Sequence, residues 1–162
     1  MQSVSLSITG IGYIPSQTKL THMLTPENMT NELARRVLGL PVYIEHDTVI
    51  QIGEVSKAII DDLQRLVVTM TIYHNSLIVS HLSDCIAIDG KTGRRALFTG
   101  ISAGTRVQLA RVNMSDGEHY LSTVGPASFT EFSIVETPDS PGCLITDWDF
   151  VMATGRTGCA SP

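Results

Sequence analysis

A serine between two glycines is the residue whose type and setting first indicate chemistry in this sequence. Ser102 lies in Gly100-Ile101-Ser102-Ala103-Gly104, which matches the pattern G-x-S-x-G. In one large class of enzymes this pattern presents a nucleophilic serine on a tight turn between a strand and a helix. Glycine-rich serine loops are also common as simple turns, so the pattern alone assigns no catalytic role.

The residues that follow Ser102 argue against that class of enzyme. Residues 105–109 alternate between polar and apolar as in a strand, whereas the turn requires a helix there. The class also has its acid and then its histidine after the serine. The only histidine after Ser102 is His119, which lies beside the predicted turn at Asp116-Gly117. An α/β-hydrolase is therefore excluded.

His46 is the best candidate for the base that a serine nucleophile needs. Residues 41–47 predict a strand in which Val42, Ile44 and His46 share one face, at the edge of the core. Asp47 would point to the other face, so the group that orients the imidazole must come from elsewhere in the chain. The other interpretation of His46 is a structural histidine at the core edge.

Three segments carry a resemblance to a known family. Residues 39–47 and 52–55 are similar to the histidine segment of tailed-phage prohead maturation proteases, an apolar strand ending in His-Asp before an Ile-Gly-x-Val strand. Residues 100–104 are similar to their Leu-Ser-Ile-Gly nucleophile segment. Residues 131–141 resemble their Glu-x-Ser-Leu-Val-x-x-Pro-Ala-Asn-Pro segment. The segments come in the family's order, and the resemblance spans most of residues 39–141.

The resemblance implies a role for one residue of each segment. Ser102 matches the nucleophile, His46 the general base and then acid, and Glu131 the third member, which orients the imidazole and stabilises its protonated form. Herpesvirus assemblins, in the same superfamily, use a histidine where Glu131 falls. The other interpretation of Glu131 is a solvated strand acid, but we expect it to share its strand face with Phe129 and Val135.

The oxyanion site is where the sequence departs from the superfamily. Assemblins share a pair of arginines that serves this site. In this sequence no such pair follows Glu131. Arg106, or the backbone near it, is the remaining candidate for an oxyanion donor. Asp139-Ser140 also stands where the phage proteases have Ala-Asn.

The resemblance implies a viral capsid (prohead) maturation serine endopeptidase that acts by acyl transfer with a Ser-His-Glu triad and needs no cofactor. Its substrates would be the scaffold protein, extensions of the major capsid protein and its own tail. It would act as a homodimer or in a scaffold-dependent assembly, inside the assembling procapsid in the host cytoplasm or nucleus. The alternative is a non-catalytic β-barrel with a structural or scaffold-binding role in a viral shell, in which the three residues are incidental.

Other combinations of reactive residues are less well supported. His81 and Cys85 are spaced as on one helix face, with His74 upstream, but no fourth ligand is at regular spacing, so we expect no metal site. A thiol enzyme that uses Cys85 or Cys143 has no supporting spacing. Trp148-Asp149-Phe150 predicts a docking patch or a lid on the core.

The hydrophobic pattern predicts the elements that must position these residues. It indicates one helix that begins at Pro26, carries Met29, Leu33, Val37 and Leu38 inward and ends at Gly39. The predicted strands are residues 3–12, 41–47, 50–60, 66–73, 96–112, 120–124 and 129–135, and a second helix covers residues 75–88. We expect residues 1–162 to form a single protease domain, with residues 155–162 a mobile tail.

These elements predict a mainly β (α+β) fold. The hairpin-type connections favour an antiparallel, closed or nearly closed barrel of about seven strands with a few helices outside, as in the assemblins.

Composition excludes several classes of protein. The chain has 162 residues, 43% hydrophobic, which suits one domain with a true core. A net charge of -5 without basic blocks argues against nucleic-acid binding. No apolar run suits a membrane span, and the first residues lack the pattern of a signal peptide, so we expect no membrane partner and no secretion. Three widely spaced cysteines indicate free thiols in a reducing compartment.

Overall fold

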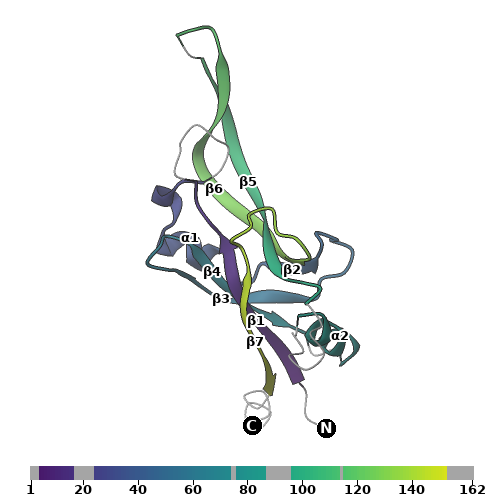
Figure 1. Cartoon of the computed structure of the whole chain (residues 1–162). Helices are drawn as coiled ribbons and strands as arrows, with labels where there is room; N and C mark the ends of the chain where they lie inside the picture. Colours follow the sequence, from purple (N-terminus) through teal and green to yellow (C-terminus); the bar gives the residue numbers. More distant parts are fainter. Residues whose placement is uncertain (1–3, 17–23, 74–75, 87–95, 114, 153–162) are drawn as a thin grey trace.

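The computed structural model describes residues 4–16, 24–73, 76–86, 96–113 and 115–152 (Figure 1). Their main element is a seven-stranded sheet in the order β5-β6-β2-β3-β4-β1-β7. The strands are β1 (Val4–Tyr13), β2 (Pro41–Ile44), β3 (Gly53–Ile60), β4 (Leu66–Ile72), β5 (Gly100–Asn113), β6 (His119–Val135) and β7 (Ile145–Met152). The described residues also form helices α1 (Asn31–Arg36) and α2 (Ser76–Ile86) and a 3-10 turn (Pro26–Asn28).

The fold is mainly β as predicted, but the sheet is mixed and curls into a half-barrel that does not close. β2 and β6 pair in parallel, with Val42 opposite Phe132 and Ile44 opposite Ile134. The other neighbouring strands pair antiparallel. The prediction of an antiparallel, closed or nearly closed barrel is therefore corrected to a mixed sheet that forms an open half-barrel. Side-chain alternation indicates which face of a strand is buried, but a partner's direction is fixed locally only when a short hairpin joins the two strands.

The outer strands β5 and β7 contact each other where they begin. Gly100 forms an isolated bridge with Leu144. The Ile101 amide donates to the Cys143 carbonyl at 2.8 Å, and the Ile145 amide donates to the Thr99 carbonyl at 2.9 Å. Beyond this point β5 and β6 leave the sheet as a two-stranded arm (Figure 1). The chain that leaves β6 is thereby fastened beside Ser102.

The core lies on the inner face of the sheet, where β1 and β4 pair. The strand predicted at residues 3–12 is confirmed as β1, in which Leu6 and Ile8 are fully buried and their neighbours are only partly so. Leu66 and Met70 of β4 are also fully buried. Burial of each such side chain contributes about 1.5–3 kcal/mol, so the central strands hold the sheet on which the site is built.

The first predicted helix is divided into two. Pro26–Asn28 form a 3-10 turn, and α1 begins only after Thr30, whose side chain accepts a hydrogen bond from the Leu33 amide at 3.1 Å. Thr30 is a second N-cap, so the chain restarts a helix instead of continuing one. Leu33 is buried as predicted, whereas Leu38 is exposed, which corrects the prediction that it points inward.

The strands predicted at residues 50–60 and 66–73 are confirmed as β3 and β4, which pair with each other antiparallel. Gly53 is a point of close approach, since a Cβ atom there would lie 2.3 Å from the Thr71 carbonyl oxygen. The irregularity in the pairing lies further along, between Val55 and Lys57. Gly53 therefore allows β3 to approach β4 closely, and the bulge is elsewhere.

The last strands differ from the sequence prediction in two ways. Residues 120–124 and 129–135 belong to one strand, β6, because it pairs with β5 on both sides of its register shifts. β7 was not predicted, since its aspartates are poor strand formers. The Asp147 carboxylate accepts a hydrogen bond from the Trp148 amide at 2.9 Å, and the Asp149 carboxylate accepts one from the Phe150 amide at 2.8 Å. These hydrogen bonds occupy backbone donors on an outer strand and discourage edge pairing.

The predicted tail at residues 155–162 lies outside the described residues. Neither α1 nor α2 is long and apolar enough to cross a lipid bilayer.

Candidate active site

His46 lies in a tight turn and not on the strand face predicted for it. β2 ends at Ile44, and both Glu45 (φ 52°) and His46 (φ 58°) have left-handed backbone conformations. The Asp47 amide closes the turn on the Ile44 carbonyl at 2.9 Å. This conformation costs a non-glycine residue roughly 1–2 kcal/mol. Histidine is among the residue types enriched there, but glutamate is not. The turn points the imidazole away from the core, and the side chain is 42% exposed.

The His46 imidazole lies between the other two predicted residues. Its Nε2 atom is 2.9 Å from the Ser102 hydroxyl, and its Nδ1 atom is 2.6 Å from Oε1 of Glu131. The Glu131 side chain is only 12% exposed, and Ser102 is 7% exposed. The structure therefore brings together Ser102, His46 and Glu131 from three separate segments.

The register of β5 and β6 determines this arrangement. Ser102 pairs with Ser133, and Gly104 pairs with Glu131. The side chains of Ser102, Ser133 and Glu131 therefore leave the same face of the sheet. β2 lies on the other side of β6 and delivers the His46 turn to that face. The site thus spans three adjacent strands, and the opposite face carries buried Phe132 and Ile134.

A bulge in β6 corrects one prediction about Glu131. Gly104 pairs with Glu131 but Thr105 pairs with Phe129, which leaves Thr130 unpaired. The extra residue reverses the alternation, and Phe129 stacks on Phe132 in the core with ring centroids 5.5 Å apart. Glu131 therefore does not share a face with Phe129.

Ser133 is a site residue that the sequence analysis missed. Its hydroxyl accepts a hydrogen bond from the His46 amide at 3.1 Å and donates one to Oε2 of Glu131 at 2.8 Å. The available signal was a lone polar residue in the apolar run Phe132-Ser133-Ile134-Val135, two positions after a candidate acid.

A cleft of about 430 Å³ opens beside Ser102. Its walls include Tyr13 from β1, Thr105 from β5 and the segment Asp139-Ser140-Pro141 after β6. A space of this size can accept several residues of an extended chain, and neither His46 nor Glu131 is among its lining residues. Arg106 is exposed opposite Ser128 and does not line this cleft, so the structure does not bring it to Ser102.

Burial raises the pKa values of two groups that line the cleft, the Cys143 thiol and the Tyr13 hydroxyl. The Tyr13 oxygen also accepts a hydrogen bond from the Leu24 amide at 2.9 Å, which opposes this effect. In the unfolded chain both groups release their protons at lower pH than in the folded protein. Protonated thiol and phenol therefore contribute stability that is lost as the pH rises.

We expect the free energy of unfolding to fall as the pH rises above about 8, where an unfolded cysteine begins to ionise. Urea titrations followed by the fluorescence of the chain's single tryptophan, Trp148, will measure this slope. Cys143→Ala should make the free energy of unfolding fall less steeply between pH 8 and 10, by about the contribution of one titrating group. A slope that is flat, or that Cys143→Ala leaves unchanged, would contradict the prediction.

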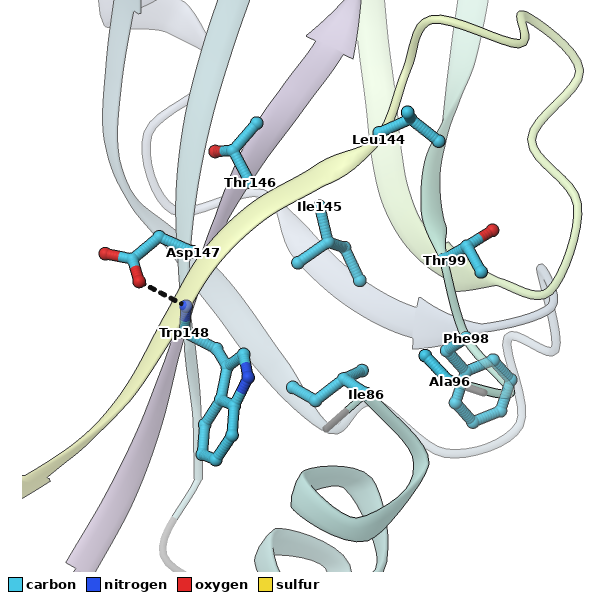
Figure 2. A pocket seen from close by; sticks show the side chains of 9 residues that line it. All are labelled: Ile86, Ala96, Phe98, Thr99, Leu144, Ile145, Thr146, Asp147 and Trp148. Carbon is cyan, nitrogen blue, oxygen red and sulfur yellow. Dashed lines mark hydrogen bonds between the residues drawn. The ribbon is translucent and has the colours of Figure 1, made fainter. Parts of the chain in front are cut away.

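Of the other reactive residues, Cys143 lines the cleft beside Ser102, whereas His81 and Cys85 lie on α2. The His81 Nε2 and Cys85 Sγ atoms lie 3.7 Å apart on α2, and His74 lies outside the described residues. Trp148 borders a second cavity, of about 480 Å³, between the end of α2 and the start of β7 (Figure 2). Its indole packs edge-to-face with Phe150 at 5.5 Å. This cavity shares no lining residue with the cleft at Ser102.

The three site residues form an arrangement that can activate a hydroxyl. A carboxylate only accepts hydrogen bonds, so His46 donates from Nδ1 to Glu131. The neutral ring then has its lone pair on Nε2, which faces the Ser102 hydroxyl and can take its proton. Such an arrangement suits attack by the serine oxygen on a carbonyl or phosphorus centre.

Comparisons with known proteins support the fold. No family model matches the sequence, and no curated protein matches it. The structure is similar to a crystal structure of the Kaposi's sarcoma-associated herpesvirus protease with a hexapeptide phosphonate inhibitor (TM-score 0.50, 16% identity, 91% of this chain and 65% of that one). A second structure of that protease, with an allosteric inhibitor, has a TM-score of 0.51 and 18% identity over 90% of this chain and 75% of that one.

The chain therefore spans slightly less than two thirds of the length of the protease chain in the first of these structures. At such identity the likeness concerns the fold, and it bears out the predicted resemblance at that level. The similarity to the phage proteases stays a prediction. This chain has an assemblin-like fold, similar to that of the herpesvirus protease.

Proposed function

We propose that this chain is a serine endopeptidase that matures a viral shell. The observation that carries the proposal is the His46 ring, hydrogen-bonded to the Ser102 hydroxyl at 2.9 Å and to the Glu131 carboxylate at 2.6 Å. The assemblin-like fold and the cleft beside Ser102 support the same conclusion. The rival function, a non-catalytic shell component, requires no such alignment of three groups.

The proposed mechanism is acyl transfer. Ser102 Oγ attacks the peptide carbonyl carbon while His46 Nε2 takes its proton. The protonated ring is stabilised by Glu131 and then gives the proton to the departing amine. Water attacks the acyl-enzyme in the same way, with His46 again as base, and the carboxyl product leaves. In this proposal the oxyanion donors lie beside the cleft that residues 139–141 line together with Ser102, and not at Arg106, which is not among its lining residues.

The proposed substrates and setting come from the resemblance. They are the scaffold protein, extensions of the major capsid protein and the protease's own tail, inside an assembling procapsid. β5 is an outermost strand of the sheet, so an extended peptide can pair with its outer edge beyond Ser102. The proposed homodimer or scaffold-dependent assembly would confine cleavage to that setting.

Reaction with a diphenyl phosphonate tests the proposed function. Attack by Ser102 Oγ forms an oxygen–phosphorus bond and releases phenol, so intact mass and peptide mapping locate the adduct. The protein is tested from dilute to concentrated, because assembly can control activity. We expect one adduct, on Ser102, in the wild type and in Ser128→Ala, a control for an exposed serine of β6. The absence of an adduct at every concentration, or its persistence in Ser102→Ala, would refute the proposal.

Gly104→Ala should impair catalysis while it preserves the fold. A Cβ atom on Gly104 would lie 2.6 Å from Oε1 of Glu131, the oxygen that faces His46, and 2.7 Å from the Thr130 hydroxyl oxygen. The end of a flexible side chain can move away, so the free energy of unfolding should change by less than about 1 kcal/mol. The moved carboxylate no longer holds the imidazole, and an error of about 1 Å can lower kcat roughly 100-fold.

A double-mutant cycle shows whether Gly104→Ala acts through Glu131. If it does, Gly104→Ala and Glu131→Gln together should cost clearly less than the sum of the two single effects. Full additivity of the two effects, or an unchanged kcat in Gly104→Ala, would argue against a role of this contact in catalysis.

A further inference from the structure

We propose that Ser133 is a positioning residue, whose hydroxyl holds both His46 and Glu131 in the geometry that acyl transfer requires. The proposal rests on the function proposed above and deepens it. Ser133 lies on β6 between β5 and β2, opposite Ser102 on one neighbouring strand and Tyr43 on the other. It is fully buried, at 0% exposure.

The hydroxyl of Ser133 has a hydrogen bond to each of two residues of the site. Its oxygen accepts a hydrogen bond from the His46 backbone amide at 3.1 Å. Its proton is donated to Oε2 of Glu131, with 2.8 Å between the two oxygens. The other oxygen of that carboxylate, Oε1, faces the His46 ring. One buried side chain therefore joins the backbone of the base to the acid that orients the base.

The direction of every proton in this network follows from its first donor. An amide only donates, so the Ser133 oxygen must accept from His46, and its single proton goes to Glu131. Glu131 then accepts with both oxygens and receives the Nδ1 proton of His46. These hydrogen bonds run from the His46 backbone amide to the His46 ring. They leave Nε2 without a proton, so its lone pair faces Ser102.

The backbone of His46 needs such support. Two consecutive non-glycine residues, Glu45 and His46, are left-handed, and surrounding contacts must maintain that conformation. Glu45 is fastened by its amide to the Ile134 carbonyl at 3.0 Å and by its carboxylate to the Glu136 amide at 2.6 Å. At His46 the corresponding backbone contact is the Ser133 hydroxyl. Without it the imidazole can move relative to Ser102.

Ser133→Ala, Ser133→Cys and Ser133→Thr test the proposal against a matched control, Ser83→Ala. Ser83 is a buried serine of α2 whose hydroxyl donates to the Ser80 carbonyl at 2.9 Å, so its removal costs a buried hydrogen bond away from the site. We expect Ser133→Ala to slow phosphonate labelling and kcat roughly 10- to 100-fold, with KM little changed. Ser83→Ala should lower the free energy of unfolding but leave the labelling rate and kcat unchanged.

Ser133→Cys keeps the volume but donates weakly, so it should remain folded and be slow. Ser133→Thr keeps the hydroxyl and should recover more of the rate than Ser133→Cys does. The free protein supplies a second readout. The downfield proton resonance of His46 Nδ1–H should broaden or disappear in Ser133→Ala, and the His46 amide should exchange at least about tenfold faster. A merely structural role would move neither signal when the protein is folded.

These readouts separate the two proposals. A wild-type His46 resonance and amide exchange rate in folded Ser133→Ala or Ser133→Cys would overturn the positioning role. A labelling rate equal to that of the wild type would do the same. If Ser102→Ala is as active as the wild type, the proposed function fails, and the resonance and exchange measurements still decide the role of Ser133.

Discussion

Ser102→Ala is expected to lower kcat for cleavage of a scaffold-derived peptide by about 10⁵- to 10⁶-fold, the loss seen when the nucleophile of a Ser-His-acid enzyme is removed. Ser102 lines the cleft that we propose for the substrate, and only its oxygen is removed. KM should therefore change little. The structure should also persist, since the Ser102 hydroxyl contacts the flexible imidazole and its neighbours Ile101 and Ala103 fix the strand.

The comparison with His46→Ala makes this prediction sharper. The proposed nucleophile and base act as one unit, so the double variant Ser102→Ala/His46→Ala should be no slower than the more impaired single variant. Rates are measured over a series of protein concentrations, with Ser128→Ala as the control. Two outcomes would show that the residues do not form a catalytic pair. In the first, the fold-losses in kcat of the two single variants multiply in the double variant. In the second, kcat of Ser102→Ala lies within tenfold of the wild type.

The trio of site residues could be found from the sequence because each lies in a segment with a family-like pattern. Ser102, His46 and Glu131 are separated in the chain, and their proximity depends on β2 pairing in parallel with β6. No local pattern encodes that pairing, which is why the trio was found from the resemblance and the sheet direction was predicted wrongly.

The errors about His46 and Glu131 share one physical cause, a departure from strict strand alternation. The left-handed turn at Glu45 and His46 ends β2 early, and an unpaired Thr130 shifts the faces of β6. Glycine, asparagine, aspartate and histidine are enriched at such positions, and although His46 is one of them, Glu45 is not, so the pair is a weak signal of a turn. Burial patterns locate a strand well, but a single extra residue reverses every face beyond it.

Ser133 shows a second limit of sequence reasoning. A serine in an apolar strand is most simply interpreted as a residue facing solvent, yet here it is fully buried between His46 and Glu131. Its burial makes sense only after the positions of both partners are known, since a buried hydroxyl requires partners. Residues that support a site are therefore harder to predict than the residues that carry out its chemistry.

Glu131→Gln is expected to lower kcat about 10⁴-fold, the effect of replacing the acid by its amide in a serine protease triad. Ser133 supplies the physical reason in this chain. Its proton is directed at the side chain of residue 131, so the carbonyl oxygen of the glutamine turns toward Ser133. The amide group then faces Nδ1 of His46 and donates to it. The ring proton moves to Nε2, where it faces Ser102 and the ring can no longer act as a base.

This reasoning predicts a reversal of sign in the double variant. Without the Ser133 proton the glutamine can rotate, so that its carbonyl oxygen accepts from Nδ1 and Nε2 regains its lone pair. Ser133→Ala should therefore slow the wild type but raise kcat of Glu131→Gln several-fold, an interaction within the range seen for residues that contact each other. Steady-state rates of the four proteins measure it. A further loss of rate in Glu131→Gln/Ser133→Ala would show that Ser133 does not determine the orientation of residue 131, and that the tautomer of His46 is fixed by some other contact.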